Sequence, residues 1–388
     1  MNLRITWVLA AALVAAQAGE AARPATSNVM NAQFPAVSED GRATFRLRAP
    51  NAARVQLQPG GSDNGLGLQP VDLLKGADGI WTVTTAPALP GFHYYWFNVD
   101  GLQVNDPGSQ TFFGWARDTS GIEIPSPRED FYEPRDVPHG QIRIEWYLSK
   151  TTGQWRRAFV YTPPGYDKDS RARFPVLYLQ HGAGENETGW SRQGRANFIL
   201  DNLIAAKAAV PMIVVMDHGY ATPRTPPSGE AAASGRGAGV LAPSAFERVV
   251  VDDLIPAIDT RYRTRADREH RAMAGLSMGS GQALQIALRN LDTFSWLGLF
   301  SGAAPSGDLA TAYNGTLANG AEFSRRVHLV FMGAGSAEAR ITTAIDASRT
   351  ALETRAIRNV VTFTSEGTSH EWQTWRRCLN AFAPRLFR

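Results

Sequence analysis

Residues 275–279 read Gly275-Leu276-Ser277-Met278-Gly279, a G-x-S-x-G pentapeptide that connects the apolar run 271–274 to the helix-compatible segment 282–291. Glycines on both sides of a serine permit a turn too sharp for larger side chains. A strand, such a turn and a helix in this order are typical of a nucleophile elbow, which exposes the serine hydroxyl. Because glycine-rich turns often carry no chemistry, the prediction of a reactive serine depends on finding a base and an acid later in the chain.

A candidate base and a candidate acid lie C-terminal to Ser277. A serine hydroxyl is barely nucleophilic at neutral pH and needs a neighbouring base. His370 comes after the strand-like run 360–363, and Glu338 comes after the run 327–332. Both therefore follow the carboxyl ends of strands, which meet at one edge of a parallel sheet. This position would bring the base close to the carboxylate that orients it. Serine, acid and histidine then occur in the chain order of the α/β-hydrolase fold. Two aspartates are rival acids, Asp308 and Asp346.

A glycine-rich loop, His181-Gly182-Ala183-Gly184, ends another strand-like run, 176–180. Its backbone N–H groups can point into the site, and the N–H groups of Ala183 and Met278 would then form an oxyanion hole. We expect His181 to fix this loop rather than to transfer protons.

Two tryptophans near these segments are candidate substrate contacts. Trp190 follows the glycine-rich loop and Trp372 follows His370. They either line the cleft or merely cover the sheet, whereas Trp375 and Trp296 are expected in the core.

The composition is that of a soluble globular protein of 388 residues, 44% hydrophobic and 19% charged. This length suits two domains, one of them large. The formal charge of +3 is small and includes no Lys/Arg block, which argues against a nucleic-acid partner. The histidines are scattered, there is one cysteine, and no H-E-x-x-H occurs. The sequence therefore predicts no metal and no other cofactor.

Residues 1–22 have the make-up of a signal peptide. Arg4 supplies the positive end, residues 5–16 the apolar core, and Ala16-Gln17-Ala18 a cleavage site. The sequence thus predicts a secreted or periplasmic protein. The apolar run is too short to span a bilayer comfortably, and no cysteine at the cleavage point offers a lipid anchor. No membrane anchor is expected in the mature chain.

Two domains and a linker are expected after this segment. Over residues 28–125, short alternating or aromatic runs are separated by Gly and Pro turns, a pattern typical of a small immunoglobulin-like β-sandwich. The proline-rich residues 126–140 form the expected linker. Over residues 141–388, apolar runs alternate with helix-period segments, which predicts an α/β domain with a mainly parallel sheet. Ser244, with Glu247 three residues later, marks the start of one helix.

Five segments of the larger domain resemble bacterial family one carbohydrate esterases of the esterase D superfamily, which include feruloyl and acetylxylan esterases. They occur in the family's order and are Pro175–Gly182, Pro211–Asp217, Asp252–Pro256, Ala274–Ala283 and Ser369–Trp372. The resemblance implies an α/β-hydrolase fold, with Ser277 as nucleophile and His370 as base. The acid of the family is usually an aspartate, and Glu338 stands where that aspartate belongs.

Three segments of the smaller domain resemble the glycogen-type carbohydrate-binding module found in front of such esterases, namely residues 43–52, 79–83 and 94–101. Trp81, Tyr95 and Trp96 would stack on sugar rings if the module binds, whereas strand aromatics of a small sandwich usually form its core.

The candidate catalytic residues all lie beyond the linker. Removal of residues 1–125 should therefore spare turnover of a small ester. The alternative is that Trp115 and the loop-like segment 112–120 build part of the cleft.

The residues and the resemblance together favour an exported serine carboxylic ester hydrolase that acts on ester-decorated plant polysaccharide or oligosaccharide. It would release ferulate or a related hydroxycinnamate through an acyl-enzyme. An acetylxylan esterase would use the same machinery with a small acyl pocket. A siderophore (enterochelin-type) esterase would need cationic side chains for a polyanionic catecholate. The non-enzyme alternative, a carbohydrate-binding protein with an inactive esterase domain, conflicts with the intact serine, histidine and glycine framework.

Overall fold

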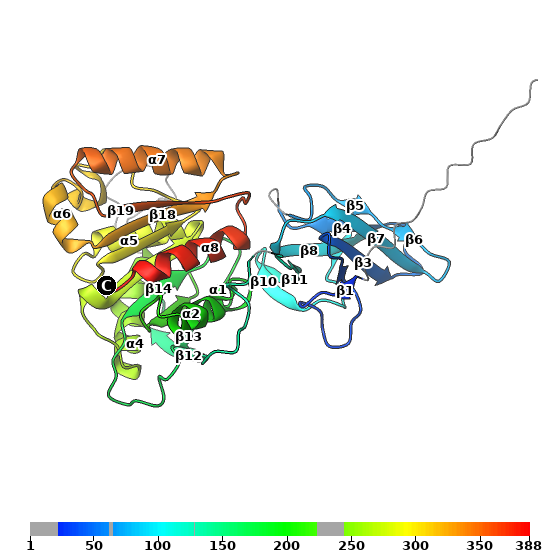
Figure 1. Cartoon of the computed structure of the whole chain (residues 1–388), viewed down its shortest axis with the longest axis horizontal. Coiled ribbons are helices and arrows are strands. Elements are labelled where there is room, and N and C mark those ends of the chain that lie inside the picture. Colours follow the sequence, from blue (N-terminus) through cyan, green and yellow to red (C-terminus); the bar gives the residue numbers. More distant parts are fainter. Residues whose placement is uncertain (1–21, 62–64, 128, 223–243) are drawn as a thin grey trace, which may run out of the picture.

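The computed structural model describes residues 22–61, 65–127, 129–222 and 244–388, so the predicted signal peptide, up to residue 21, lies outside the described residues. Figure 1 shows two units side by side, a smaller β unit in blue and cyan and a larger unit of sheet and helices in green to red. The predicted fold class is confirmed, because a mostly parallel sheet with helices follows antiparallel sheets.

The N-terminal domain consists of two antiparallel sheets. The first has the order β1-β2-β3-β7-β6 and is formed by Arg23–Pro24, Ala36–Val37, Arg42–Arg48, Ile80–Pro87 and Leu74–Lys75. The second has the order β10-β11-β8-β4-β5, and its strands in that order are Thr111–Gly114, Arg117–Ile124, Gly91–Val99, Val55–Pro59 and Val71–Asp72. A further strand, β9 (Leu102–Val104), pairs with β8.

Strand alternation gives this domain two apolar surfaces. Phe45 of β3 and Tyr95 of β8 meet in the core between the sheets, with ring centroids 4.8 Å apart. Residues of β8 with the opposite parity, Phe92 and Tyr94, pack instead against the core of the larger domain. Strand β8 is therefore covered on both faces.

The larger domain is built on one sheet of eight strands in the order β12-β13-β15-β14-β16-β17-β18-β19. In chain order the strands are Gln141–Ser149, Gln154–Thr162, Val176–Gln180, Ile213–Asp217, Arg271–Leu276, Trp296–Phe300, Leu329–Gly335 and Val360–Ser365. The pairs from β15 to β19 are parallel, whereas β12 and β13 pair antiparallel at one edge. The carboxyl ends of the parallel strands therefore lie along one edge, as the sequence predicts.

Helices cover both faces of this sheet (Figure 1). One face packs on α3 to α7, which are Ala245–Arg248, Ile255–Arg261, Met278–Arg289, Gly320–Arg326 and Ala339–Thr354, and on the π-helical turn Val249–Leu254. The other packs on α1, α2 and α8, which are Gly189–Arg192, Ala196–Ala205 and Trp372–Phe382. As predicted, the Ser244 side chain caps α3 by accepting the N–H of Glu247 at 3.0 Å. No helix in the described ranges is long and apolar enough to cross a membrane.

The segment 126–140 contains no helix or strand among its described residues, and it packs on the larger domain. Tyr132 is 1% exposed and lies under the guanidinium of Arg376, 4.3 Å from its ring centre. The Asn202 amide donates to the carbonyls of Phe131 and Glu133. This connection is thus bound along its length rather than loose.

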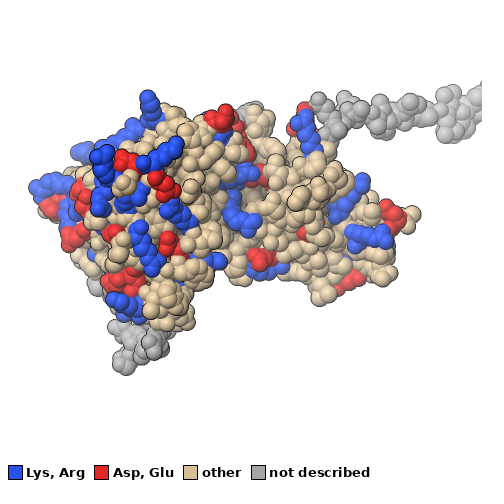
Figure 2. Space-filling view, turned by 90° about the horizontal axis from the view of Figure 1, so that it is seen from below, with Lys and Arg blue, Asp and Glu red and all other residues tan. Residues whose placement is uncertain are grey.

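A buried ion pair joins the two domains. Arg376 of α8 donates two hydrogen bonds, at 2.7 and 2.9 Å, to the carboxylate of Glu123 on β11. Burial alone would raise the pKa of Glu123, but Arg376 and Arg195 hold it below its usual value. On the outer surface, by contrast, Figure 2 shows basic and acidic side chains interspersed, so the small net charge forms no continuous patch on that face.

Candidate active site

Ser277 lies in the turn between β16 and α5, at the carboxyl edge of the sheet. Its φ of 51° and ψ of −114° are unusual for a residue with a side chain. The neighbouring chain approaches so closely that a Cβ on Gly275 would lie 2.4 Å from the Gly279 carbonyl, and one on Gly279 would lie 2.5 Å from the His181 carbonyl. Both glycines of the pentapeptide are therefore required by contact, as in a nucleophile elbow.

Ser277, His370 and Glu338 form one chain of hydrogen bonds. His370 Nε2 lies 2.9 Å from Ser277 Oγ, and His370 Nδ1 lies 2.7 Å from Glu338 Oε1. Because an ionised carboxylate only accepts, Nδ1 carries the proton and Nε2 is free to accept the serine hydroxyl. The three residues come from the β16–α5 turn, the β19–α8 loop and the β18–α7 loop.

The Glu338 carboxylate is held on both oxygens. Oε2 accepts the Ser301 hydroxyl at 2.6 Å and the Gly335 N–H at 2.7 Å. Burial would raise the pKa of Glu338, but the hydrogen bonds from His370, Ser301 and Gly335 outweigh it and hold the pKa below its usual value. The rival acids do not reach His370. Asp308 is exposed and binds Thr311, and Asp346 is exposed on α7.

The loop of residues 182–185 lines the cleft beside Ser277, and a Cβ on Gly182 would lie 3.5 Å from that of Ser277. The Gly182 N–H donates to Glu185 Oε2 at 3.2 Å, and the Gly184 N–H donates to the Tyr220 hydroxyl at 2.7 Å. Ala183, between them, lines the cleft, and its N–H has no acceptor within the described residues. The second expected donor, the Met278 N–H, belongs to the first residue of α5, where backbone N–H groups have no partner inside the helix.

His181 fixes this loop. Its Nε2 accepts the Gly219 N–H at 2.9 Å, so Nδ1 carries the proton and donates to the Gly182 carbonyl at 2.8 Å. Burial lowers the pKa of His181 to about 4. The ring is therefore neutral at physiological pH and serves as a fixed link between two loops.

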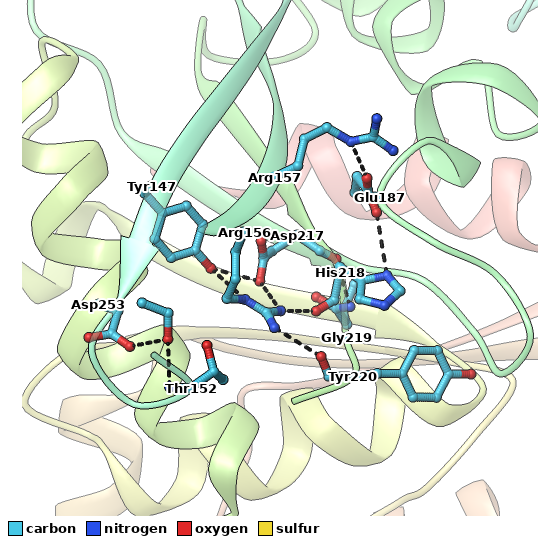
Figure 3. A network of polar contacts seen from close by, with 12 residues as sticks. Tyr147, Thr152, Arg156, Arg157, Glu187, Asp217, His218, Gly219, Tyr220 and Asp253 are labelled. Atoms are coloured by element: carbon cyan, nitrogen blue, oxygen red, sulfur yellow. Dashed lines mark hydrogen bonds and ion pairs between the residues drawn. The ribbon is translucent and has the colours of Figure 1, made fainter. Parts of the chain in front are cut away.

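A polar network around Arg156 holds the 217–220 turn in place (Figure 3), and this turn binds the same loop through Tyr220. Arg156, 8% exposed, donates to Tyr147, to Asp217 at 2.8 Å and to the carbonyls of His218 and Tyr220. Tyr220 in turn accepts the Gly184 N–H. Sequence reasoning missed this network. Its one local signal was that Asp217 ends a buried strand.

The cleft is a cavity of about 520 Å³ that opens above Ser277 and His370. The larger domain lines it mainly with Leu276, Trp372, Trp375 and the 182–185 loop, and the N-terminal domain supplies Gly60, Gly61, Phe92, His93, Tyr94, Trp115 and Ala116. The candidate catalytic residues lie beyond the linker, but the cleft has the arrangement of the alternative, in which Trp115 and the turn that carries it build part of its wall. No group of three His, Cys, Asp or Glu side chains in the described ranges could hold a metal ion.

The tryptophan predictions are correct in part. Both side chains are buried, at 1% exposure for Trp190 and 2% for Trp372, but only Trp372 lines the cleft. The Trp190 indole donates to the Gln180 carbonyl, and its ring packs edge-on against Trp372 at 5.5 Å. Trp190 thus supports a cleft residue from behind. Trp375 and Trp296 lie in the core, as expected, and Trp375 also borders the cleft, edge-on against His370 at 5.2 Å.

The aromatic residues expected to stack on sugar in the N-terminal domain are buried. Trp81, Tyr95 and Trp96 are 6%, 0% and 7% exposed. Trp115, which is 51% exposed, instead extends into the cleft from the turn between β10 and β11. The feature of the sequence that could have indicated this role is an aromatic residue directly after Gly114 in a short turn.

Comparison with known proteins gives one family match. The model of the Esterase family, described as "Putative esterase", matches residues 149–386. An "Endo-1,4-beta-xylanase/feruloyl esterase" of Xylanibacter ruminicola is 40% identical over 371 residues, 94% of this chain and 47% of that protein. Endo-1,4-beta-xylanase Y of Acetivibrio thermocellus is 29% identical over 46% of this chain and 16% of its own length. The chain thus spans about half the length of the first relative and less of the second.

Solved structures share the fold. A CE1 ferulic acid esterase from Anaeromyces mucronatus has a TM-score of 0.53 and 22% identity, covering 68% of this chain and 96% of that one. The enterobactin esterase from Shigella flexneri has a TM-score of 0.61 and 18% identity, covering 88% of this chain and 92% of that one. At these identities the likeness speaks for the fold alone. Since the family model spans more than half of its residues, the chain belongs to the Esterase family, and it resembles a xylanase/feruloyl esterase in sequence and feruloyl esterases in fold.

Proposed function

We propose that the protein is a serine carboxylic ester hydrolase that releases hydroxycinnamates, ferulate foremost, from arabinoxylan. The observation that carries this proposal is the hydrogen-bonded chain from Ser277 through His370 to Glu338 at the bottom of an aromatic cleft. Its order, carboxylate to imidazole to hydroxyl, is the one that activates a serine for acyl transfer.

The reaction proceeds through an acyl-enzyme. Ser277 Oγ attacks the ester carbonyl while His370 Nε2 takes its proton, and Glu338 stabilises the imidazolium. The N–H groups of Ala183 and Met278 bind the oxyanion. His370 then protonates the leaving sugar oxygen as the carbon–oxygen bond breaks. Water, deprotonated by His370, attacks the acyl-enzyme and releases the acid and free Ser277.

The cleft lining favours an aromatic acyl group. Phe92, Tyr94, Trp115, Trp372 and Trp375 surround the space above Ser277. Flat aromatic side chains pack well on a phenyl ring, edge-on or offset, whereas an acetyl group would fill little of this volume. The relative from Xylanibacter ruminicola, which is named a feruloyl esterase, supports the same acyl group.

The siderophore alternative fits the lining less well. Within the described residues, the cleft is lined by no lysine or arginine, and it includes the carboxyl groups of Glu185 and Glu371. A polyanionic iron–catecholate would meet acidic rather than basic groups there. The likeness to enterobactin esterase extends over most of the chain but concerns the fold.

For the N-terminal domain we propose a role as a wall of the cleft rather than as a module that stacks sugars on Trp81, Tyr95 and Trp96, since all three are buried. Export through the segment 1–22 is also part of the proposal. N-terminal sequencing of the protein recovered outside the cytoplasm would test it.

The deciding experiment compares catalytic efficiency on methyl ferulate, acetylated xylan and a catecholate siderophore, with Ser277→Ala as the blank. We expect the highest kcat/KM on methyl ferulate. A higher kcat/KM on acetylated xylan or on the siderophore would assign the enzyme to that substrate instead of to feruloyl esters. Absence of hydrolysis of every ester would overturn the proposal.

A further inference from the structure

Glu185 is a buried carboxyl group in the cleft that the proposed mechanism does not use. Its side chain is 5% exposed. Oε2 accepts the Gly182 N–H at 3.2 Å, and Oε1 accepts the Tyr94 hydroxyl at 3.1 Å. A carboxyl group in an apolar site is destabilising unless hydrogen bonds compensate for lost water, so its presence calls for a functional account.

Tyr94 reaches Glu185 from β8 of the N-terminal domain. Its hydroxyl accepts the Gln193 amide at 2.6 Å and lies 3.4 Å from the Trp372 indole N–H. The hydroxyl proton has two acceptors within reach, Glu185 Oε1 at 3.1 Å and the Phe113 carbonyl at 3.5 Å, and the shorter hydrogen bond is the one to Glu185. The orientation of the Tyr94 hydroxyl is thus set by groups from the larger domain.

The same loop has a second contact with the N-terminal domain. The Ala116 N–H, from the turn between β10 and β11, donates to the Gly184 carbonyl at 2.8 Å. Gly182 and Gly184, on either side of Ala183, are therefore both linked to the N-terminal domain. These links set the direction of the Ala183 N–H, and an oxyanion donor acts only when it is held in place before the reaction.

We propose that Tyr94 and Glu185 are positioning residues through which the N-terminal domain holds the Ala183 amide in place for the oxyanion. The chain of contacts runs from the Tyr94 hydroxyl to the Glu185 carboxyl group and on to the Gly182 N–H. The inference rests on the proposed ester hydrolysis at Ser277, but on no particular acyl group. It gives the N-terminal domain a part in the chemical step.

The polar surroundings of Glu185 agree with this role. Burial raises the pKa of Glu185 to about 7. Four groups partly offset this rise by lowering the pKa, namely the Gly182 N–H, the Tyr94 hydroxyl, the charge of His370 and the Trp372 indole. These groups come from the loop itself, from β8, from the β19–α8 loop and from α8, so Glu185 interacts with groups of both domains at the cleft.

The test uses two neighbouring tyrosines. Tyr94→Phe removes only the hydroxyl that binds Glu185. The matched control is Tyr95→Phe, which removes a buried hydroxyl that binds Asp106 at 2.7 Å on the other face of the same strand. For Tyr94→Phe we expect kcat to fall about tenfold on both 4-nitrophenyl acetate and methyl ferulate, with little change in KM, since loss of one hydrogen bond costs about 1.4 kcal/mol. Tyr95→Phe should keep the wild-type kcat.

A second variant tests the chain of contacts. Glu185→Gln should lower kcat on both esters, and the double variant should lose little more than the larger single effect, because both changes interrupt one path. Equal kcat for Tyr94→Phe and Tyr95→Phe would overturn the inference alone. A loss confined to KM for methyl ferulate would also overturn it and make Tyr94 a substrate contact. An inactive wild-type protein would overturn the proposed function together with this inference.

Discussion

At the scale of single residues, Ser277 combines a strained backbone with a half-buried side chain that lines the cleft. Ser277→Ala should therefore leave the thermal unfolding midpoint nearly unchanged. It should lower kcat by about 10³-fold or more, as expected when a triad serine is removed. Retention of more than about a tenth of wild-type turnover, in protein freed of contaminating esterases, would exclude Ser277 as the nucleophile.

Glu338 differs from the rival acids in what it contacts. Glu338→Gln keeps the shape but cannot stabilise the imidazolium and favours the wrong tautomer of His370, so kcat should fall roughly 10² to 10⁴-fold. Asp308→Asn and Asp346→Asn, both at exposed positions, should keep wild-type rates. The three variants belong in one assay. A larger loss in either aspartate variant than in Glu338→Gln would give the acid role to that aspartate.

Glu185 should also make stability depend on pH. Its pKa is about 7 in the folded protein and near 4.5 when unfolded, so its contribution is fully present below pH 4.5 and is lost as pH rises through 7. Glutamine does not titrate. Between pH 4.5 and 8, the unfolding free energy of Glu185→Gln should therefore rise relative to wild type by roughly 3 kcal/mol, at 1.36 kcal/mol per pKa unit. Denaturant titrations at both pH values measure this, and a constant difference would contradict it.

At the scale of strands and turns, the sequence predicted the central strands well because burial on both faces makes them short continuous apolar runs. It did not reveal β12 and β13 as individual strands. Ile144, Trp146 and Leu148 of β12 are more than half exposed, so that edge strand alternates and lacks a continuous apolar run. The proximity of Ser277, His370, Glu338 and the 182–185 loop was predictable because each follows a recognisable strand.

Contacts between the domains were not predictable from local pattern. Tyr94 and Glu185 are 91 positions apart, and Glu123 and Arg376 are 253 apart. Periodicity reports which face of a strand is apolar but not which partner covers it. Trp190 was misplaced for a related reason, because a single helical turn gives too few residues to define a face.

The turn between β10 and β11 carries its own prediction. Trp115 and Ala116 have φ of 61° and 58°, as in a two-residue hairpin turn that usually contains Asn and Gly. Strain of this kind persists where the side chain is used. Trp115→Ala should raise KM for methyl ferulate about tenfold, equivalent to 1.4 kcal/mol, and affect 4-nitrophenyl acetate less. Steady-state kinetics on both esters would show it; an equal effect on the two would argue against an acyl contact.

At the scale of the whole molecule, the shared cleft reverses an expectation from the sequence. Removal of residues 1–125 takes away Phe92, Tyr94 and Trp115 from the cleft and leaves Arg376 buried without Glu123. The truncated protein should be destabilised by roughly 3–5 kcal/mol and lose turnover even on 4-nitrophenyl acetate.

Arg376→Met provides the matched variant for this truncation. It removes the unpaired charge, so it should restore folding of the shortened chain, as judged by circular dichroism and thermal melting. It should not restore turnover, because the wall of the cleft and the link to the 182–185 loop are still missing. A folded truncation with wild-type kcat would contradict the role assigned to the N-terminal domain.

Helix α8 comes after every strand of both domains in the chain, yet it carries Trp372 and Trp375 of the cleft and the arginine that clamps β11. During synthesis the N-terminal domain leaves the ribosome before the larger domain and can fold early. The part of its surface that contacts α8 then stays uncovered until that helix has been made and docks. A chain interrupted before α8 would have the serine in its turn but would lack Trp372 and Trp375 of the cleft, so we expect hydrolysis only once translation has passed this helix.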